Sequence, residues 1–438
     1  MSDFIKKLIE YEEKVAIIDD NKSYSYKELV QKTKEWEKLL KQKSIEQKTV
    51  AILGNYSFDN ITLFLALYTL KNIIVPIATT IKTLQEEFIQ ESLCEYVIKD
   101  NDITKVAADK THPMIENLIS SKHSGLVLFS SGSTGKPKAM IHNLDKLIDS
   151  YLGKRAKNIN MLLFLMFDHI GGLNTLFNAL SMGASVIIPK NKDATTICAL
   201  IERYKIAILP SSPTFLNLLL ISKEHTRYDL SSLRMITYGT ETMPESLLVK
   251  LKEQFPKVKM LQTFGTSETG ISTTSSKSSN SLYMKLDGVE QRVVDGELWL
   301  KSDTQILGYL NSSMESFTSD GWFKTGDLVE IDGEYIKIIG RAKEVINVGG
   351  QKVLPSEVES LILQLDIIDD VMVYGELNAI TGQAVVCDVV LNKRQENIKK
   401  TIRLFCKNKL EPYKTPTKVY VVSKTNFGDR FKKIRRKV

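Results

Sequence analysis

The sequence predicts an α/β protein: a large N-terminal domain of parallel-rich sheets covered by helices, followed by a small α+β C-terminal domain. From about residue 46, short β-branched runs alternate with longer amphipathic runs, as strands alternate with helices. The strand-like runs are continuously apolar, which is typical of parallel strands that are covered on both faces. The chain has 438 residues, 43% of them hydrophobic, which is enough for two domains and a large core.

The alternation predicts each element in turn. We expect strands over residues 50–53, 73–77, 185–188, 206–209, 233–238 and 258–262, and helices over 59–70, 194–204, 213–221 and 244–255. Residues 272–281 are crowded with Ser and Thr and predict a loop.

After Gly340 the pattern starts again. A helix from Pro355, strands near 371–374 and 384–390, and a helix near 396–407 form a block of roughly 95 residues, the size of a small domain. We place the boundary in the segment 340–343, which gives domains over residues 1–341 and 342–438.

Charge, cysteines and apolar runs exclude several classes of protein. The formal charge is +7, and residues 424–438 supply nearly all of it with seven Lys/Arg and one Asp, so a nucleic-acid-binding face is not expected. The four cysteines are scattered without CxxC spacing, which indicates a reducing compartment rather than disulfides or zinc. The N-terminus has no secretory signal, and runs such as 61–70 are too short to span a bilayer. We therefore expect a cytoplasmic protein without a membrane span.

The most informative stretch runs from Phe129 to Lys138, directly after an apolar run. Small residues and hydroxyls in a turn after a strand present several donors to one anion, and lysines add positive charge. The candidate polyphosphate-binding residues are Ser130, Ser131, Gly132, Ser133, Thr134, Gly135 and Lys138. The spacing is not that of a Walker A loop, because Pro137 follows Lys136 where Ser or Thr would be needed. Ser/Gly clusters are usually plain surface loops, and that is the competing interpretation.

This loop resembles the AMP-binding signature of adenylate-forming enzymes, the superfamily of acyl- and aryl-CoA synthetases, luciferases and amino-acid adenylation domains. Three further segments resemble its motifs in the same order: Thr263-Phe264-Gly265-Thr266-Ser267-Glu268, Gly321-Trp322-Phe323-Lys324-Thr325-Gly326-Asp327, and Gly340 to Lys343 with Gly349 to Glu359. The first departs from the family pattern, with Phe for Tyr and Ser for Thr.

The resemblance implies roles that also make chemical sense. Glu268 is a hard-oxygen ligand suited to a Mg²⁺ ion that bridges phosphates. Phe264 offers an aromatic face to adenine, opposite Gly239, Thr240 and Glu241. Gly265, Thr266 and Ser267 belong to the same ATP-binding segment. Asp327 can accept both ribose hydroxyls, and Arg341 can bind the ribose or phosphate side. Taken singly, Glu268 and Asp327 would more readily be interpreted as surface or helix-capping carboxylates.

The resemblance further implies a catalytic lysine in the C-terminal tail. Family members end in a Gly-Lys-Ile-x-Arg-like segment, and Lys433-Ile434-Arg435-Arg436 fits it, although Lys432 stands in place of the glycine. We select Lys433 and keep Lys432 as the alternative; a basic tail that only solubilises is the competing interpretation. His169 resembles the histidine beside the acyl-carboxylate pocket of CoA ligases, and a structural histidine is the alternative. Asp168 resembles the Asp that pairs with the ammonium group in amino-acid-activating domains.

The family reaction has two steps. A carboxylic acid attacks the α-phosphorus of ATP to give an acyl-adenylate and pyrophosphate, and a thiol then takes the acyl group and releases AMP. The implied cofactors are ATP, Mg²⁺ and CoA or phosphopantetheine, and the partners are a small carboxylic acid and CoA or an acyl carrier protein. An enzyme accelerates such a reaction mainly by positioning the reactants and by neutralising the charge on the phosphates. The small domain is expected to be mobile, with Lys343 as its hinge and Gly349, Gly350 and Lys352 lining a thiol tunnel.

Two other functions remain open from the sequence. A stand-alone amino-acid adenylation enzyme that loads a carrier protein would require an ammonium group on its substrate. A non-catalytic nucleotide-binding relative would bind ATP without acid-dependent turnover. A dehydrogenase is disfavoured because no G-x-G-x-x-G segment occurs.

Overall fold

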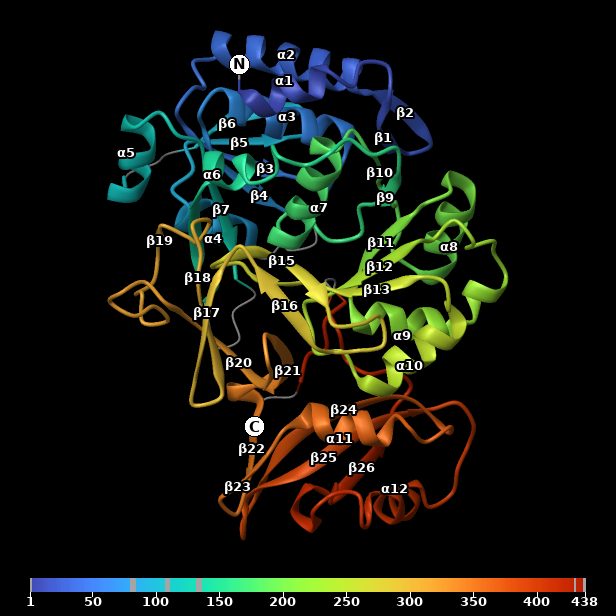
Figure 1. Cartoon of the computed structure of the whole chain (residues 1–438). Helices are drawn as coiled ribbons and strands as arrows, with labels where there is room; N and C mark the ends of the chain where they lie inside the picture. The colour runs from blue at the N-terminus through green and yellow to red at the C-terminus, as the bar shows by residue number, and fades with distance from the viewer. Residues whose placement is uncertain (1, 79–83, 107–110, 131–135, 429–430, 436–438) are drawn as a thin grey trace.

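The computed structural model describes the chain except for residues 1, 79–83, 107–110, 131–135, 429–430 and 436–438. Within this part the strands form four sheets, three in the large domain and one in the small domain (Figure 1). The helices of the large domain are α1 (Asp3–Ile9), α2 (Tyr26–Gln42), α3 (Phe58–Thr69), α4 (Gln85–Glu91), α5 (Pro113–Ser120), α6 (Leu144–Asp149), α7 (Ile170–Ser181), α8 (Ala194–Tyr204), α9 (Pro213–Ser222) and α10 (Glu245–Gln254).

The first sheet has the order β19-β8-β7-β4-β3-β5-β6. Its centre is parallel and consists of β3 (Thr49–Leu53), β4 (Ile73–Ile77), β5 (Tyr96–Lys99) and β7 (Gly125–Phe129). The antiparallel strands β6 (Asp102–Lys105), β8 (Ala139–Asn143) and β19 (Gly308–Tyr309) complete it. Every residue of β4 and β7 is buried, as expected of continuously apolar strands between layers of helices.

The second sheet carries the strands that position the site. Its order is β13-β12-β11-β9-β10-β1-β2, and only the pairing of β1 with β2 is antiparallel. The strands are β1 (Val15–Asp19), β2 (Lys22–Ser25), β9 (Asn160–Leu162), β10 (Ser185–Ile187), β11 (Ile208–Ser211), β12 (Met235–Tyr238) and β13 (Lys259–Gln262). The predicted strand and helix alternation of residues 185–262 is confirmed to within a few residues.

The third sheet is antiparallel throughout, which the sequence did not predict. Its order is β14-β15-β16-β21-β20-β18-β17, and its strands are β14 (Phe264–Thr266), β15 (Gly270–Ser276), β16 (Met284–Asp287), β17 (Glu290–Val294), β18 (Glu297–Lys301), β20 (Phe323–Asp332) and β21 (Tyr335–Arg341). The predicted loop over 272–281 is therefore wrong, since β15 covers its first half and pairs with β16. Thr favours strands, and the exposed face of an antiparallel strand accepts hydroxyls, so polarity alone did not indicate a loop here.

The small domain is an α+β unit. Its sheet contains β22 (Ile346–Val348), β23 (Gln351–Val353), β24 (Ile368–Asn378), β25 (Gly382–Leu391) and β26 (Lys418–Val421), with helices α11 (Pro355–Ile362) and α12 (Ile398–Cys406). Residues from the sheet and both helices share one core, for example Val371, Val358 and Ile402. The predicted helix from Pro355 and the predicted strands are confirmed; the domain boundary at Arg341 stays a prediction.

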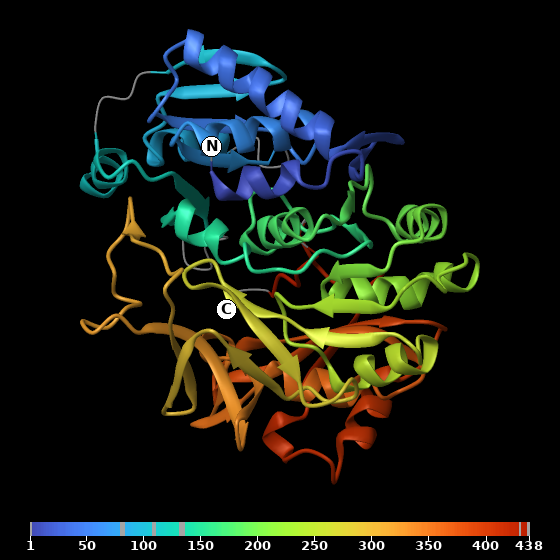
Figure 2. The same cartoon turned by 45° about the horizontal axis from the view of Figure 1, so that its top comes forward.

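The C-terminal tail returns from the small domain to the large one. In Figures 1 and 2 the red end of the chain enters the middle of the molecule. The ring of Phe431 lies 5.4 Å from the rings of Phe164 and Phe215, and the Ser212 hydroxyl donates to the Phe431 carbonyl. Both domains therefore contribute to the space between them.

Across the described residues, no helix combines the length and apolarity that a bilayer crossing requires.

Candidate active site

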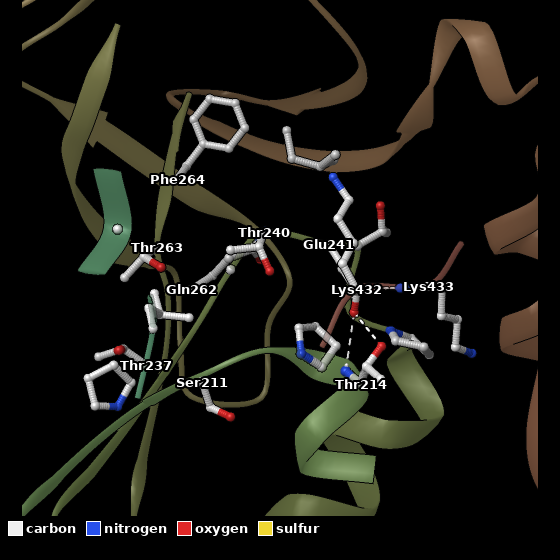
Figure 3. A pocket seen from close by; sticks show the side chains of 18 of the residues that line it. Ser211, Thr214, Thr237, Thr240, Glu241, Gln262, Thr263, Phe264, Lys432 and Lys433 are labelled. Atoms are coloured by element: carbon white, nitrogen blue, oxygen red, sulfur yellow. Dashed lines mark hydrogen bonds between the residues drawn. The ribbon is translucent and has the colours of Figure 1, made fainter. Parts of the chain in front are cut away.

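A pocket opens at the carboxyl ends of β11, β12 and β13, the place where ligands bind in open α/β sheets (Figure 3). Strands β20 and β21, helix α11 and the tail complete its walls. Predicted site residues that line it are His169, Gly239, Thr240, Glu241, Phe264, Gly265, Asp327, Arg341, Lys433 and the alternative Lys432.

Gly239 and Thr263 belong to two walls of the pocket that lie very close together. A Cβ added at Gly239 would lie 2.7 Å from the Thr263 carbonyl oxygen, closer than two such atoms can approach. Glycine therefore lets the segment after β12 lie against the segment that leads into Phe264. These are the two walls predicted to hold adenine.

Asp327 and Arg341 form a cross-strand pair between β20 and β21. Arg341 Nε lies 2.9 Å from Asp327 Oδ1, and the Asp327 residue is only 4% exposed. Burial raises the pKa of Asp327, and the nearby Arg341 opposes that rise. The pair presents a polar, buried surface that can hold a ligand rich in hydroxyls.

At the pocket, hydrogen bonds of the Glu241 carboxylate link its own segment to the start of α9 and to the C-terminal tail. Its Oε2 accepts from the amide of Thr214 at 3.2 Å and from the Thr214 hydroxyl at 2.6 Å, and its Oε1 accepts from the Lys433 amide. Burial raises the pKa of Glu241, while the bonds from Thr214 and Lys433 oppose the rise. The carboxylate therefore fixes the tail against the start of α9.

The two tail lysines point to different sides. Lys433 Nζ lies 2.8 Å from Asp370 Oδ1 and donates to the Val371 carbonyl at 2.7 Å, so it is anchored in the small domain. Burial on its own would lower the pKa of Lys433, but Asp370 and Glu359 raise it. Arg435, two residues on, faces the same way and pairs with Glu344 and Glu359.

Lys432 also lines the pocket, but its side chain lies near Arg341 and Glu241 and not near Asp370. Within the part of the chain that the structure describes, its amine makes no hydrogen bond or ion pair. Burial lowers the pKa of Lys432, and the Arg341 charge lowers it further. An unpaired, desolvated cation in a pocket is poised to bind an anion.

The Lys-x-x-Arg spacing of the tail can thus be matched in two ways. In one match, Lys433 stands three residues before Arg436, which lies outside the described residues. In the other, Lys432 stands three residues before Arg435. In the structure Arg435 is held by the small domain while Lys432 is turned toward the large one. The two lysines therefore have different surroundings, Lys433 beside the small domain and Lys432 beside Arg341 and Glu241.

His169 caps the N-terminus of α7 and lines the same pocket. Its Nδ1 accepts from the Gly171 amide at 3.0 Å. When neutral, the ring therefore carries its proton on Nε2. His169 therefore has the structural role that was the alternative to a direct one. Its place in the pocket lining is also compatible with the predicted position beside the acyl carboxylate.

Of the predicted phosphate-binding residues, the structure describes Ser130 and Lys138, and neither lines this pocket. Ser131, Gly132, Ser133, Thr134 and Gly135 are outside the described residues. Ser130 closes the base of the loop, since its Oγ accepts from the Lys138 amide at 3.1 Å.

Tyr309 contacts both Lys138 and Glu268. The Lys138 ammonium lies 4.8 Å from the Tyr309 ring centroid, and the Tyr309 hydroxyl donates to Glu268 Oε1 at 3.2 Å. Thr266, in the same segment as Ser267, accepts from the Thr269 amide at 3.1 Å. A cation and a carboxylate thus lie together at the base of the predicted phosphate loop.

The predicted hinge and tunnel residues are separate from the pocket. Lys343 lies in a short 3-10 helix (Ala342–Glu344) directly after β21. Gly349 and Gly350 form the turn between β22 and β23 with φ of +58° and +87°, which glycine adopts without strain. Neither these glycines nor Lys352 lines the pocket.

Sequence reasoning missed Thr214 and Asp370, which hold Glu241 and Lys433. Neither residue belongs to a motif used above, and only the folded chain brings them to the tail. Glu359, which pairs with Arg435, belongs to a motif quoted above. The pairing could not be predicted, because the two residues are 76 positions apart in the sequence.

Comparison with known proteins identifies the family. The AMP-binding enzyme family matches residues 6–310, and the AMP-binding enzyme C-terminal domain matches residues 357–427. The chain therefore belongs to the AMP-binding enzyme family, as its motifs indicated.

Curated relatives include 4-coumarate–CoA ligase 4 of Arabidopsis thaliana, which is 27% identical over 72% of this chain and 61% of its own length. Indoleacetate–CoA ligase of Aromatoleum aromaticum is 30% identical over 67% of this chain and 62% of its own length. The chain thus spans about three-fifths of the length of these relatives.

Solved structures confirm the fold. That of the anthranilate CoA ligase AuaEII in complex with anthranoyl-AMP has a TM-score of 0.83, at 20% identity over 99% of this chain and 95% of the other. That of o-succinylbenzoate CoA synthetase from Bacillus subtilis in complex with OSB-AMP has a TM-score of 0.76, at 20% identity over 97% and 95%.

Proposed function

We propose that this protein is an AMP-forming acid–thiol ligase that activates a carboxylic acid with ATP and transfers the acyl group to CoA. The observation that carries the proposal is the pocket in which Asp327, Arg341, the Gly239 wall and an unpaired tail lysine meet. Family membership and the CoA ligases among its relatives support it.

In the first step the acid's carboxylate forms a bond to the α-phosphorus of ATP, and the bond to pyrophosphate breaks. Asp327 would accept the ribose hydroxyls, and Phe264 would stack on adenine. Lys432 would neutralise charge on the α-phosphate and orient the attacking carboxylate. Lys433 would anchor the tail through Asp370, which differs from the role assigned to it from the sequence.

Magnesium fits the residues at the phosphate side. No group of three His, Cys, Asp or Glu ligands occurs among the described residues. Mg²⁺ is commonly bound by one or two carboxylates together with substrate phosphates. Glu268 would supply that carboxylate beside Lys138, and the ion would neutralise phosphate charge.

In the second step the thiol attacks the acyl carbon, and AMP leaves. The Gly349–Gly350 turn would line the thiol path after the small domain rotates about Lys343, because in the present arrangement the turn lies away from the pocket. The acceptor is proposed as CoA, and a carrier-protein phosphopantetheine remains the second candidate.

Acid-dependent ATP–pyrophosphate exchange with Mg²⁺ tests the proposal, with AMP and thioester measured after CoA is added. We expect exchange with at least one class of acid, and thioester only when CoA is present. Tight ATP binding without exchange for fatty, aromatic, hydroxy or amino acids would instead favour the non-catalytic relative.

A further inference from the structure

Both peptide groups that flank Lys432 are hydrogen-bonded to the large domain. On one side, the Ser212 hydroxyl donates to the Phe431 carbonyl at 2.8 Å. On the other side, the Lys433 amide donates to Glu241 Oε1. These bonds are made to the main chain of the tail, so they hold the tail whatever side chains it carries.

The peptide group between Lys432 and Lys433 is held at both of its polar atoms. Its N–H donates to Glu241, and its carbonyl accepts from the Gly428 amide at 3.1 Å within the tail. Because a peptide group is planar, these two bonds fix the orientation of the main chain at this point. The directions in which the two lysine side chains leave the main chain are therefore fixed as well.

The groups that hold the tail are themselves fixed by the start of α9. Ser212 is the N-cap residue of α9, and its Oγ accepts from the Phe215 amide at 3.2 Å. Figure 3 shows the two bonds from Thr214 to the Glu241 carboxylate, one from its amide and one from its hydroxyl. Ser212 and Thr214 are both buried. The large domain therefore presents a hydroxyl donor and a carboxylate acceptor to the tail from fixed positions.

These bonds use most of the hydrogen-bonding capacity of Glu241. Its Oε2 accepts two hydrogen bonds from Thr214, and its Oε1 accepts the bond from Lys433 in the tail. A carboxylate offers about four lone pairs in all. The carboxylate that the sequence placed opposite Phe264 is therefore engaged mainly with protein groups.

The main chain of Phe431 is strained, which also indicates that the tail is held here. Its φ is +49°, in the left-handed region that residues other than glycine rarely adopt. Such a conformation persists where the surrounding contacts stabilise it. Those contacts are the bond from Ser212 and the rings of Phe164 and Phe215, whose centroids both lie 5.4 Å from that of Phe431.

We propose that Glu241 and Ser212 are positioning residues that seat the tail lysines for the first half-reaction. Both bind the main chain beside the lysines, so they set where the adenylating ammonium group lies without contacting the acid. Both bonds join the large domain to the tail, so they act only while the tail lies in the pocket. The inference rests on the proposed function, because it concerns the lysine of the same site.

Substitution of Glu241 tests the proposal. Glu241→Ala removes the acceptor of the Lys433 amide, and we expect kcat for acid-dependent exchange to fall about ten- to a hundredfold, because a small displacement of a reacting group is that costly. KM for ATP, and thioester formation from supplied acyl-adenylate, should stay close to the parent values. Glu241→Gln keeps an acceptor oxygen for the tail and should retain most of the exchange. Glu253→Ala, exposed on α10 and outside the pocket, is the matched control.

A double-mutant cycle shows whether Glu241 acts through a tail lysine. Glu241→Ala is combined with Lys432→Ala and, in parallel, with Lys433→Ala, and exchange is measured for every single and double variant. Once the lysine that supplies the charge is removed, its position no longer matters. The double variant should then be no slower than that lysine variant alone. Ser212→Ala should show the same non-additivity.

Additive losses with both lysine variants would overturn the inference while the proposed function stands. Equal losses in Glu241→Gln and Glu241→Ala would assign the effect to the charge of the carboxylate and overturn it too. A matching rise in KM for ATP or loss of thioester formation would also overturn it, because Glu241 would then act on the nucleotide or on the whole site. Absence of exchange with every acid in the parent protein would defeat the proposed function itself.

Discussion

At the scale of single residues, the tail shows what a motif can and cannot predict. The sequence indicated that a lysine near the end of the chain belongs to the site, and it offered Lys433 and Lys432. Side chains in an extended segment alternate between two faces, so adjacent lysines must point to opposite sides. Which one is anchored to the small domain depends on Asp370 and on the Glu241 bond to the Lys433 amide. No property of the local sequence encodes those partners.

His142 gives a prediction at the same scale. It is fully buried in β8, with the carbonyls of Ser267 and Thr304 beside its ring, and burial lowers its pKa to about 4. The unfolded chain takes up this proton near pH 6.5. Between pH 6.5 and pH 4 the unfolded state therefore binds more protons, and His142 makes the protein less stable as the pH falls, by up to about 3 kcal/mol.

Urea unfolding at several pH values measures this effect. The His142→Asn variant should lose a corresponding part of the pH slope, whatever its stability at pH 7. His112→Asn, which alters the N-cap of α5, should keep the slope of the parent. An unchanged slope in the His142 variant would contradict the assignment.

At the scale of elements, strands and helices of the parallel sheets were predictable because burial on both faces makes their sequences continuously apolar. The antiparallel sheet was not, since strands such as β15 keep a solvent-facing side and tolerate Ser and Thr. Their pairing with distant strands, as of β20 with β18, is a property of the whole fold. The motifs identified Asp327 and Arg341 as site residues. That the two are cross-strand partners could not be predicted, because the antiparallel sheet itself was not.

The approach of the β12 end to Thr263 gives an element-scale prediction. Gly239→Ala places a Cβ against the Thr263 carbonyl, so one wall must move and the adenine site is distorted. We expect ATP affinity to fall about tenfold or more, because a shift of a few tenths of an ångström to 1 Å at a binding site is costly. Nucleotide titration measures the loss.

Gly153→Ala is the control, since a Cβ there meets nothing within 4 Å. It should bind ATP as the parent does. Equal ATP affinity of the two variants would show that the close approach has no part in nucleotide binding.

At the scale of the whole molecule, the site exists only because the tail of the small domain reaches the large domain. Asp370 and Glu359 hold Lys433 and Arg435 on one side, while Phe431 packs on Phe164 and Phe215 on the other. The sequence predicted two domains and the motifs of each. It could not predict this arrangement, because the Phe431 contacts join residues more than 200 positions apart, and the pairings of Lys433 and Arg435 span 63 and 76 positions.

We propose that the tail supplies the adenylation charge through Lys432 and is anchored by Lys433. The direct test is to measure both half-reactions, ATP–pyrophosphate exchange and thioester formation from supplied acyl-adenylate, in Lys432→Ala and Lys433→Ala.

We predict that Lys432→Ala lowers exchange by about a hundredfold or more and leaves thioester formation within a few fold, since its charge acts only in the first step. Lys433→Ala should keep more exchange and lower thermal stability instead, because Asp370 is left buried without its partner. Abolished exchange in Lys433→Ala with near-normal exchange in Lys432→Ala would show that Lys433, and not Lys432, supplies the charge.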